Sequence, residues 1–263
     1  MHRSIRALTL LLALLLFLLM TTITTNASTL SIGENELYVS FLNIPDGEAT
    51  LIQTSEGKNF LINTGSKDSR IELWEQLKEL HVNQLEGLIL TNQTDEYCGN
   101  MKQILENFDV KQVYYANSEK QLFTANSNKT MWNKDDEIKL GNAFNIHVLQ
   151  TNTFGEMTFT IEYGENSILY MSVNDTNSDE GLESYDLKSE IIKIVDYGQS
   201  NSPSSKLLHE MDPHISIVFN QKSGTPNRDL MERLNESWID VYQLKQVGTT
   251  IIRLNLSDYE IIS

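Results

Sequence analysis

Patterns typical of short strands alternate with patterns typical of helices along this chain, and the alternation occurs in both halves. From residue 37 to residue 115 the predicted order is strand, strand, strand, helix, strand, helix, strand. A β-rich middle, residues 144 to 173, precedes a second series of helices and strands that extends to residue 254. No Pro-rich or low-complexity linker separates the halves. The order predicts an α/β (α+β) fold, with one domain of two packed sheets flanked by helices.

Three local patterns predict where individual elements begin and end. Residues 55–58, Ser-Glu-Gly-Lys, lie between two β-rich segments and predict a hairpin turn. Ser69 followed by Glu72 is a capping-box pattern, which predicts that the Ser69 side chain caps the next helix. The stretch from Asp179 to Glu190 is expected to be helical.

The charge and cysteine content exclude several classes of protein. The chain has 20 Lys and Arg against 36 Asp and Glu, a formal net charge of -16. Nucleic-acid affinity rests largely on basic side chains that displace counterions, so a basic nucleic-acid-binding module is excluded. The single cysteine, Cys98, cannot form an internal disulfide, and no Cys-rich zinc module is possible. An acidic globular domain stabilised by its core remains.

Residues 1–27 have the pattern of an export signal. Arg3 and Arg6 precede an apolar stretch, residues 8–20, and small residues before Ser28 offer a cleavage site. The stretch is shorter than the roughly 20 residues of a spanning helix, although its extension to residue 23 keeps an uncleaved anchor open. We expect a signal peptide or N-terminal membrane anchor at 1–27, a short linker at 28–35 and a single domain at 36–263. The protein is then extracellular, secreted or tethered to the outer face of the cytoplasmic membrane.

Several separated segments carry a resemblance to a known family. They are residues 41–52 (FLNIPDGEATLI), 57–65 (GKNFLINTG), 88–91 (LILT), 193–202 (KIVDYGQSNS) and 224–234 (GTPNRDLMERL). In order and spacing they resemble metallo-β-lactamase-fold hydrolases, above all the extracellular domain of DNA-uptake competence proteins and its secreted relatives. The resemblance covers roughly residues 36 to 255. It implies a four-layer αβ/βα sandwich.

The same resemblance shows where this chain departs from the family. After a strand ending in Thr, the family has His-x-His-x-Asp-His-x-Gly-Gly, whose side chains bind one or two divalent metals. Here Thr91 is followed by Asn-Gln-Thr-Asp-Glu-Tyr-Cys-Gly-Asn, and Gly99 is expected to be kept for its backbone. None of the five histidines, at 2, 81, 147, 209 and 214, lies in a matching segment. The family's metal-site positions correspond to Asn63, Asn92, Thr94, Glu96, Tyr97, Asn174, Asp196, Tyr197 and Thr225.

These replacements predict a chain without the family's chemistry. A structural four-ligand zinc site contributes on the order of 10 to 16 kcal/mol, so each ligand accounts for roughly 3 kcal/mol. Without the ion, a bound water has no route to hydroxide at neutral pH. We therefore assign no catalytic, cofactor-binding or metal residues, and expect a non-catalytic binding or regulatory module. Its expected partner is an unknown protein or small-molecule ligand, with no nucleic acid and no membrane contact beyond the N-terminal segment.

Other chemistry stays open as an alternative. Asp95, Glu96, Asp175 and Asp196 could converge on an oxygen-ligand site for calcium, magnesium or manganese, which would make a phosphoesterase-like hydrolase. Cys98 has no neighbouring histidine in sequence, so we expect a buried structural thiol rather than a nucleophile. The histidines within strand and helix patterns are likewise expected to be structural.

Tryptophans could form an aromatic recognition surface. Trp74 is explained by its helical stripe, whereas Met131-Trp132 lies in a polar segment and is a candidate contact, with Trp238 as a possible companion.

Overall fold

The computed structural model describes residues 32–119, 128–175 and 177–262. The predicted signal or anchor at 1–27 and the first part of the predicted linker lie outside the described residues. Within the described ranges, no helix is long and apolar enough to cross a membrane.

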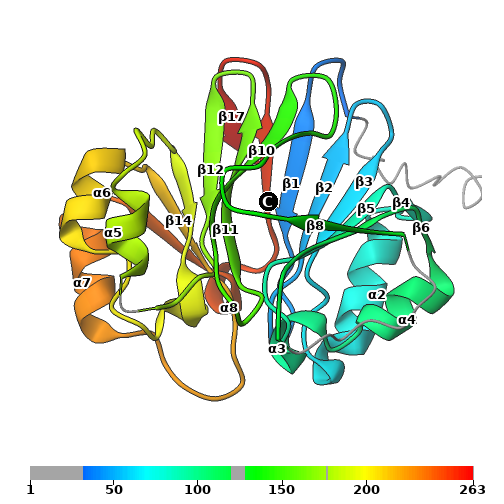
Figure 1. Ribbon diagram of the computed structural model, residues 1–263, viewed down its shortest axis with the longest axis horizontal. Helices are drawn as coiled ribbons and strands as arrows, with labels where there is room; N and C mark the ends of the chain where they lie inside the picture. The colour runs from blue at the N-terminus through cyan, green and yellow to red at the C-terminus, as the bar shows by residue number, and fades with distance from the viewer. Residues whose placement is uncertain (1–31, 120–127, 176, 263) are drawn as a thin grey trace, which may run out of the picture. The chain divides into compact units, whose positions relative to one another are not determined.

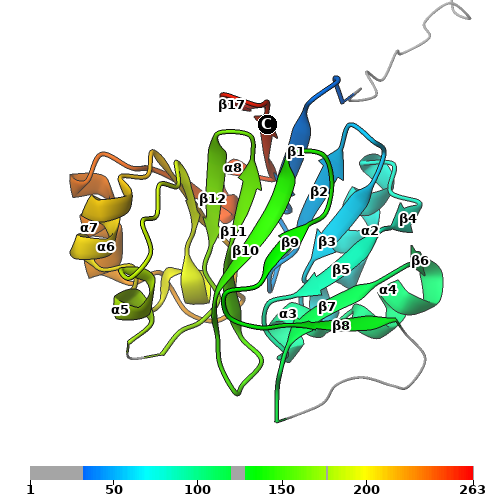
Figure 2. The same cartoon turned by 45° about the horizontal axis from the view of Figure 1, so that its top comes forward.

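The first sheet has eight strands in the order β17-β16-β1-β2-β3-β5-β7-β8. Strands β17 to β3 pair antiparallel, and β3 to β8 pair parallel. Figure 2 shows β1, β2, β3, β5 and β7 in series. The bounds are β1 Leu37–Phe41, β2 Thr50–Thr54, β3 Asn59–Ile62, β5 Gly87–Leu90, β7 Val113–Ala116, β8 Lys129–Trp132, β16 Thr250–Leu254 and β17 Tyr259–Ile261.

The second sheet has seven strands in the order β15-β14-β13-β12-β11-β10-β9. It repeats the plan of the first sheet, because β9 to β12 are antiparallel and β12 to β15 are parallel. Its bounds are β9 Glu137–Lys139, β10 Phe144–Thr151, β11 Met157–Tyr163, β12 Asn166–Tyr170, β13 Ile191–Lys193, β14 Ile215–Val218 and β15 Asp240–Gln243. A separate short parallel pair consists of β4 Gln84–Leu85 and β6 Asp109–Val110.

Helices cover the outer face of each sheet, so the domain has four layers (Figure 1). The first sheet is flanked by α2 and α4, and the second by α5, α6 and α7. The helices are η1 Lys67–Ser69, α2 Arg70–Glu79, α3 Asp95–Cys98, α4 Met101–Asn107, α5 Ser178–Leu182, η2 Val195–Gly198, α6 Ser205–Met211, α7 Arg228–Glu236 and α8 Leu244–Val247. The predicted two-sheet sandwich is confirmed.

Apolar residues fill the space between the layers. Phe60 of β3 meets Phe144 of β10 edge to face, with ring centroids 5.4 Å apart, so the two sheets pack directly on each other. On the outer side, α7 buries Leu230 and Leu234, which lie one turn apart and face the second sheet. Each such leucine contributes about 2 kcal/mol by leaving water. The helices therefore hold the sheets in place chiefly through amphipathic faces.

Two of the local predictions are wrong and one is confirmed. The turn at 55–58 is a hairpin closed by a bond from the Thr54 amide to the Lys58 carbonyl, 3.0 Å. The Ser69 hydroxyl does not cap α2, because it donates to the Asp46 carbonyl at 2.6 Å instead. The helix expected at 179–190 ends with α5 at Leu182, and the rest of that stretch is an irregular connection to β13.

Candidate functional site

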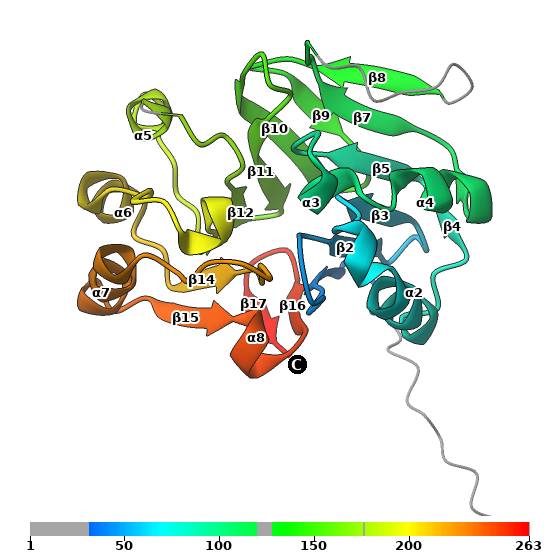
Figure 3. The ribbon, with the colours of Figure 1, turned by 90° about the horizontal axis from the view of Figure 1, so that it is seen from below.

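A small cavity opens where four strands end. The carboxyl ends of four strands, β5, β12, β13 and β14, lie along one edge of the domain. In parallel sheets, ligands usually bind beyond the carboxyl ends of the strands. Figure 3 looks onto this edge, where α3 and α8 lie. The cavity has a volume of about 170 Å³. We call it the edge cavity; its lining is Asn92, Thr94, Glu96, Tyr97, Glu156, Ser172, Asn174, Val195, Asp196, Tyr197 and Gln221.

The backbone at the floor of the edge cavity is strained. Asp196 and Tyr197 in η2 have φ values of 49° and 55°, in the left-handed region. This conformation costs a residue other than glycine roughly 1–2 kcal/mol, and two in succession are uncommon. The turn places the Asp196 carboxyl in the cavity and buries the Tyr197 ring against Tyr97, with centroids 5.9 Å apart.

A buried ion pair lies beneath this floor. The ammonium of Lys193, at the end of β13, lies 2.5 Å from the Glu48 carboxyl, and both side chains are fully buried. The ammonium also donates to the Met171 carbonyl at 2.9 Å and lies 4.9 Å from the centre of the Tyr170 ring. These contacts compensate part of the cost of removing an ammonium from water.

Burial perturbs the acid–base properties of this region. Desolvation raises the pKa of Glu48 to about 7, although the Lys193 ammonium opposes the shift. Desolvation lowers the pKa of Lys193, and Glu48 opposes that shift in turn. Partial burial also raises the pKa of Asp196. Burial and the nearby Glu48 carboxyl raise the pKa values of Tyr97 and Tyr197 well above the ordinary range, so both phenols stay protonated.

The lining carboxylates are held by amide groups. Glu156 accepts hydrogen bonds from the side chains of Asn92, at 3.2 Å, and Asn152, at 2.7 Å. Asn174 donates its backbone amide to Glu156 at 3.3 Å and its side-chain amide to Asp196 at 3.3 Å. Two of the three acids in the cavity therefore already have neutral donors.

Solved structures with the same arrangement identify the fold. The sequence itself matches no protein-family model and no curated protein. The metallo-beta-lactamase fold protein YhfI from Bacillus subtilis superimposes with a TM-score of 0.58 at 11% identity, over 80% of this chain and 96% of that one. A diphosphatase from the PhnP family gives 0.55 at 9% identity, over 85% and 99%. The diiron β-hydroxylase CmlA from Streptomyces venezuelae gives 0.55 at 9%, over 88% of this chain and 54% of that chain.

The chain has the metallo-β-lactamase fold. The fold implies a divalent metal centre, but the residues at the edge cavity do not fit one. No imidazole or thiolate lines the cavity, and its carboxylates are spread among amides and phenols. Across the described ranges, no group of three or more His, Cys, Asp or Glu side chains could hold a metal ion.

The structure brings together only part of the predicted acidic set. Glu96 and Asp196 line the edge cavity. Asp95 instead points outward and pairs with Lys67 at 3.1 Å, and Asp175 accepts a local bond from the Asn177 amide. The alternative four-acid site is therefore not assembled.

Glu156 is a lining residue that sequence reasoning missed. It follows the turn between β10 and β11, far in sequence from every matching segment. The neighbouring amide of Met157 donates to the Thr91 carbonyl at 2.8 Å, which brings Glu156 beside Asn92. No sequence motif marks this pairing, because it depends on how the two sheets meet.

The other positions that the resemblance assigns to the metal site lie in three different places. Asn63 is buried below the site, where its side chain bonds both the amide and the hydroxyl of Thr91, at 2.9 and 2.8 Å. Thr94 lines the edge cavity, whereas Thr225 lines the adjoining one. The chain around Gly99 explains its retention, because an added Cβ would lie 2.5 Å from the Lys67 amide nitrogen.

Cys98 and the histidines of the described ranges do not line the edge cavity. Cys98 is buried, donates to the Asn92 carbonyl at 2.9 Å, and has its thiol pKa raised strongly by burial. His147 packs edge to face on Tyr185, and His214 shares a 3.0 Å hydrogen bond with the Tyr259 hydroxyl. These are structural roles.

The tryptophans do not form one surface. Trp132 is buried and stacks on Tyr114, with centroids 4.5 Å apart, because residues 129–132 form β8 beside β7. Trp74 packs edge to face on Phe108. Only Trp238, 94% exposed, stands free of the core among the three. The expected contact at Met131-Trp132 is wrong for Trp132, although Met131 is exposed.

A second cavity adjoins the first. It has a volume of about 480 Å³ and shares Tyr197 and Gln221 with the edge cavity. We call it the amide cavity, because five side-chain amides line it: Gln199, Asn220, Gln221, Gln243 and Gln246. Lys245 is the one charged residue in its lining.

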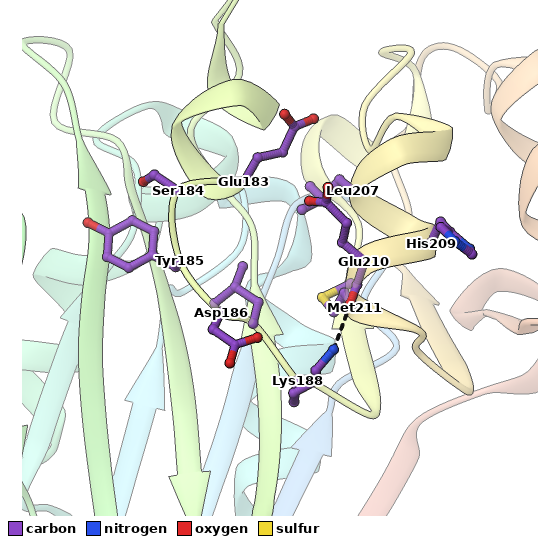
Figure 4. Close-up of a pocket in the computed structure, with 10 residues that line it drawn as sticks. Glu183, Ser184, Tyr185, Asp186, Lys188, Leu207, His209, Glu210 and Met211 are labelled. Atoms are coloured by element: carbon purple, nitrogen blue, oxygen red, sulfur yellow. Dashed lines mark hydrogen bonds between the residues drawn. The ribbon is translucent and has the colours of Figure 1, made fainter.

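A further cavity, of about 550 Å³, lies between α6 and residues 183–188 (Figure 4). Its lining mixes acidic side chains with Lys188, whose ammonium donates to the Glu210 carbonyl at 3.0 Å. One connection and one helix form it, and no strand end contributes. We assign it no function.

Proposed function

We propose that this is an exported metallo-β-lactamase-fold protein in which the metal-binding residues have been replaced, and that it acts as a non-catalytic binding or regulatory module. The observation that carries the proposal is the amide network in the edge cavity. Glu156 and Asp196 receive hydrogen bonds from Asn92, Asn152 and Asn174, so these acids need no cation to be stable.

The positions that the resemblance assigns to metal ligands support the same proposal. Among them, Asn92, Thr94, Tyr97 and Asn174 are poor ligands for zinc or iron at neutral pH. Glu96 and Asp196 are the two that keep a carboxylate. Tyr97 is protonated, since burial raises the pKa of its phenol. No imidazole or thiol lines the edge cavity, and two of its three carboxyl groups accept hydrogen bonds from amides, so we propose binding rather than turnover.

A second candidate is a metal-dependent hydrolase with a rebuilt carboxylate site. Glu96, Glu156 and Asp196 line one cavity, and carboxylates suit manganese, magnesium or calcium, but the three would have to move together to hold an ion. The hydrolase would require a bound ion for activity, whereas the non-catalytic binding module would not.

Metal content and turnover separate the candidates. We expect the purified protein to contain less than about 0.1 equivalent of zinc, manganese or iron by mass spectrometry. We also expect no hydrolysis of bis(p-nitrophenyl) phosphate above buffer with 1 mM manganese. One bound equivalent together with turnover that Asp196→Asn abolishes would establish the hydrolase and overturn the non-catalytic proposal.

The proposed export rests on residues 1–27, which carry the basic and apolar pattern of a signal or anchor. N-terminal sequencing of fractionated cells tests it. A mature chain that begins near Ser28, or an intact chain in the membrane fraction, supports export. The full-length chain in the cytoplasmic fraction would contradict it.

A further inference from the structure

The edge cavity is negatively charged and has no basic side chain in its lining. Glu96, Glu156 and Asp196 contribute three carboxyl groups. Lys193 is not part of this lining, and its ammonium is fully buried against the Glu48 carboxyl. A ligand that enters is therefore favoured when it is cationic.

The size and walls of the edge cavity suit the end of one side chain. Its volume of about 170 Å³ is well below the roughly 300 Å³ at which pockets for whole small molecules begin. The rings of Tyr97 and Tyr197 line it, and aromatic faces attract ammonium and guanidinium groups. These features match a Lys or Arg side chain.

The Tyr197 hydroxyl is a buried polar atom in the wall between the two cavities. Its side chain is buried, lines both cavities, and has no partner within hydrogen-bond geometry among the described residues. The Tyr97 hydroxyl lies beside it and opposes the rise of the Tyr197 pKa that burial causes. The two hydroxyls do not meet the distance and angle criteria of a hydrogen bond. A protonated phenol left in this state can accept a hydrogen bond from an incoming ammonium.

The amide cavity supplies what a peptide backbone needs. Each side-chain amide offers both donors and an acceptor, which complement the N–H and C=O of a peptide group. Gln243 is half-buried and Gln246 is exposed, so both side chains lie at the open side of the amide cavity. A free polyamine would make no use of these acceptor–donor pairs.

We propose that the two cavities form one cleft that binds a basic segment of a polypeptide. A Lys or Arg side chain enters the edge cavity between Glu96 and Asp196, and the flanking backbone lies along the amide cavity. The inference rests on the proposed non-catalytic function and names the partner of the same site. The formal charge of -16 for the whole chain favours approach of a basic partner.

An NMR titration of the ¹⁵N-labelled protein with capped heptapeptides tests this proposal, with chelator present to exclude metal bridging. The probes are Gly-Gly-Ser-Lys-Ser-Gly-Gly, the same peptide with norleucine for lysine, and spermidine. We expect the lysine peptide to bind at least about tenfold more tightly than the norleucine peptide or spermidine, because one well-placed charge pair contributes about that much to affinity. Equal binding of the norleucine peptide, equal binding of spermidine, or no peptide binding would overturn the proposal.

Matched variants locate the binding charge. Asp196→Asn and Glu96→Gln should each weaken the lysine peptide by about tenfold, and asparagine tolerates the left-handed backbone at position 196. Asp175→Asn removes the same charge outside the cleft and should change binding by less than about twofold. An equal loss in all three variants would mean non-specific attraction and would overturn the proposal. Failure of peptide binding without metal binding contradicts this inference alone, whereas manganese binding contradicts the proposed function.

Discussion

Lys193 is an ammonium held away from water, and its stability depends on one carboxyl group. Glu48 lies 2.5 Å away, with no exposure of either side chain. Breaking a buried pair by removing one partner costs about 3–5 kcal/mol, because the other charge is left without compensation. The pair therefore ties the loop before β2 to the end of β13, below the cleft.

Replacement of Lys193 should destabilise the fold in a pH-dependent way. Burial raises the pKa of Glu48 from 4.5 to about 7 even though the Lys193 ammonium opposes the shift, so removal of that ammonium raises the pKa further. A raised carboxyl pKa stabilises the fold at low pH, and this stability is lost as the pH rises through the folded value. In Lys193→Met the ionised form has no partner, so we expect a loss of about 3–5 kcal/mol at pH 8 and clearly less at pH 5.5. Urea unfolding at the two pH values measures it.

The control for this prediction removes the carboxylate as well. In the double variant Lys193→Met, Glu48→Gln, no buried charge is left alone, so the extra loss at pH 8 should disappear. A single variant that is equally destabilised at both pH values would show that Lys193 acts by packing and not through its charge.

At the scale of elements, the turn between α3 and α4 needs a glycine for space. At Gly99 an added Cβ would lie 2.5 Å from the Lys67 amide nitrogen and 2.6 Å from the Asp95 carbonyl, both backbone atoms. Overpacking of this kind costs about 1–3 kcal/mol, and rigid backbone places the cost at the upper end. We therefore expect Gly99→Ala to lower the free energy of unfolding by about 2–3 kcal/mol in urea denaturation.

Gly141 provides the matched substitution. Its nearest neighbour to an added Cβ lies 3.6 Å away, an ordinary contact. Gly141→Ala should change stability by less than about 0.5 kcal/mol. If both variants lose similar free energy of unfolding, the loss comes from replacing a flexible glycine and not from the close backbone approach at position 99.

Elements with strong local patterns could be predicted from the sequence, and elements set by tertiary contacts could not. The apolar run of β5 and the amphipathic pattern of α7 specify these elements almost alone. The connection at 183–190 is irregular despite its helical composition, and the Tyr185 hydroxyl anchors it by a bond to the Leu149 carbonyl at 3.0 Å. The edge strand β8 was missed because a short polar strand has little pattern of its own.

The candidate site divides in the same way. Positions that follow strand ends in order, such as Asn92 and Asp196, were found through the resemblance. Glu156 was missed, since its place depends on the Met157 amide meeting Thr91 across the two sheets. The amide cavity was also missed, because residues from β14 to α8 converge there only in the folded chain.

At the scale of the whole molecule, charge decides which partners can approach. Residues 28–263 contain 18 basic and 36 acidic residues, a formal charge of -18. Phosphate backbones are repelled by such a surface, and the cleft offers them three carboxyl groups. We expect no DNA binding in a fluorescence assay at about 50 mM salt with manganese present, although low salt favours attraction. Micromolar binding that weakens as salt rises would contradict this prediction.

Thermal denaturation with and without metal tests the central claim, that the cleft is stable without a divalent ion. A ligand at 100 times its dissociation constant stabilises the folded state by about 2.7 kcal/mol, which raises the melting temperature of a domain this size by several degrees. We predict that excess chelator, or zinc or manganese at about 1 mM, shifts the melting temperature by less than about two degrees. A rise of several degrees with manganese, abolished by Glu96→Gln or Asp196→Asn but kept in Asp175→Asn, would contradict the account.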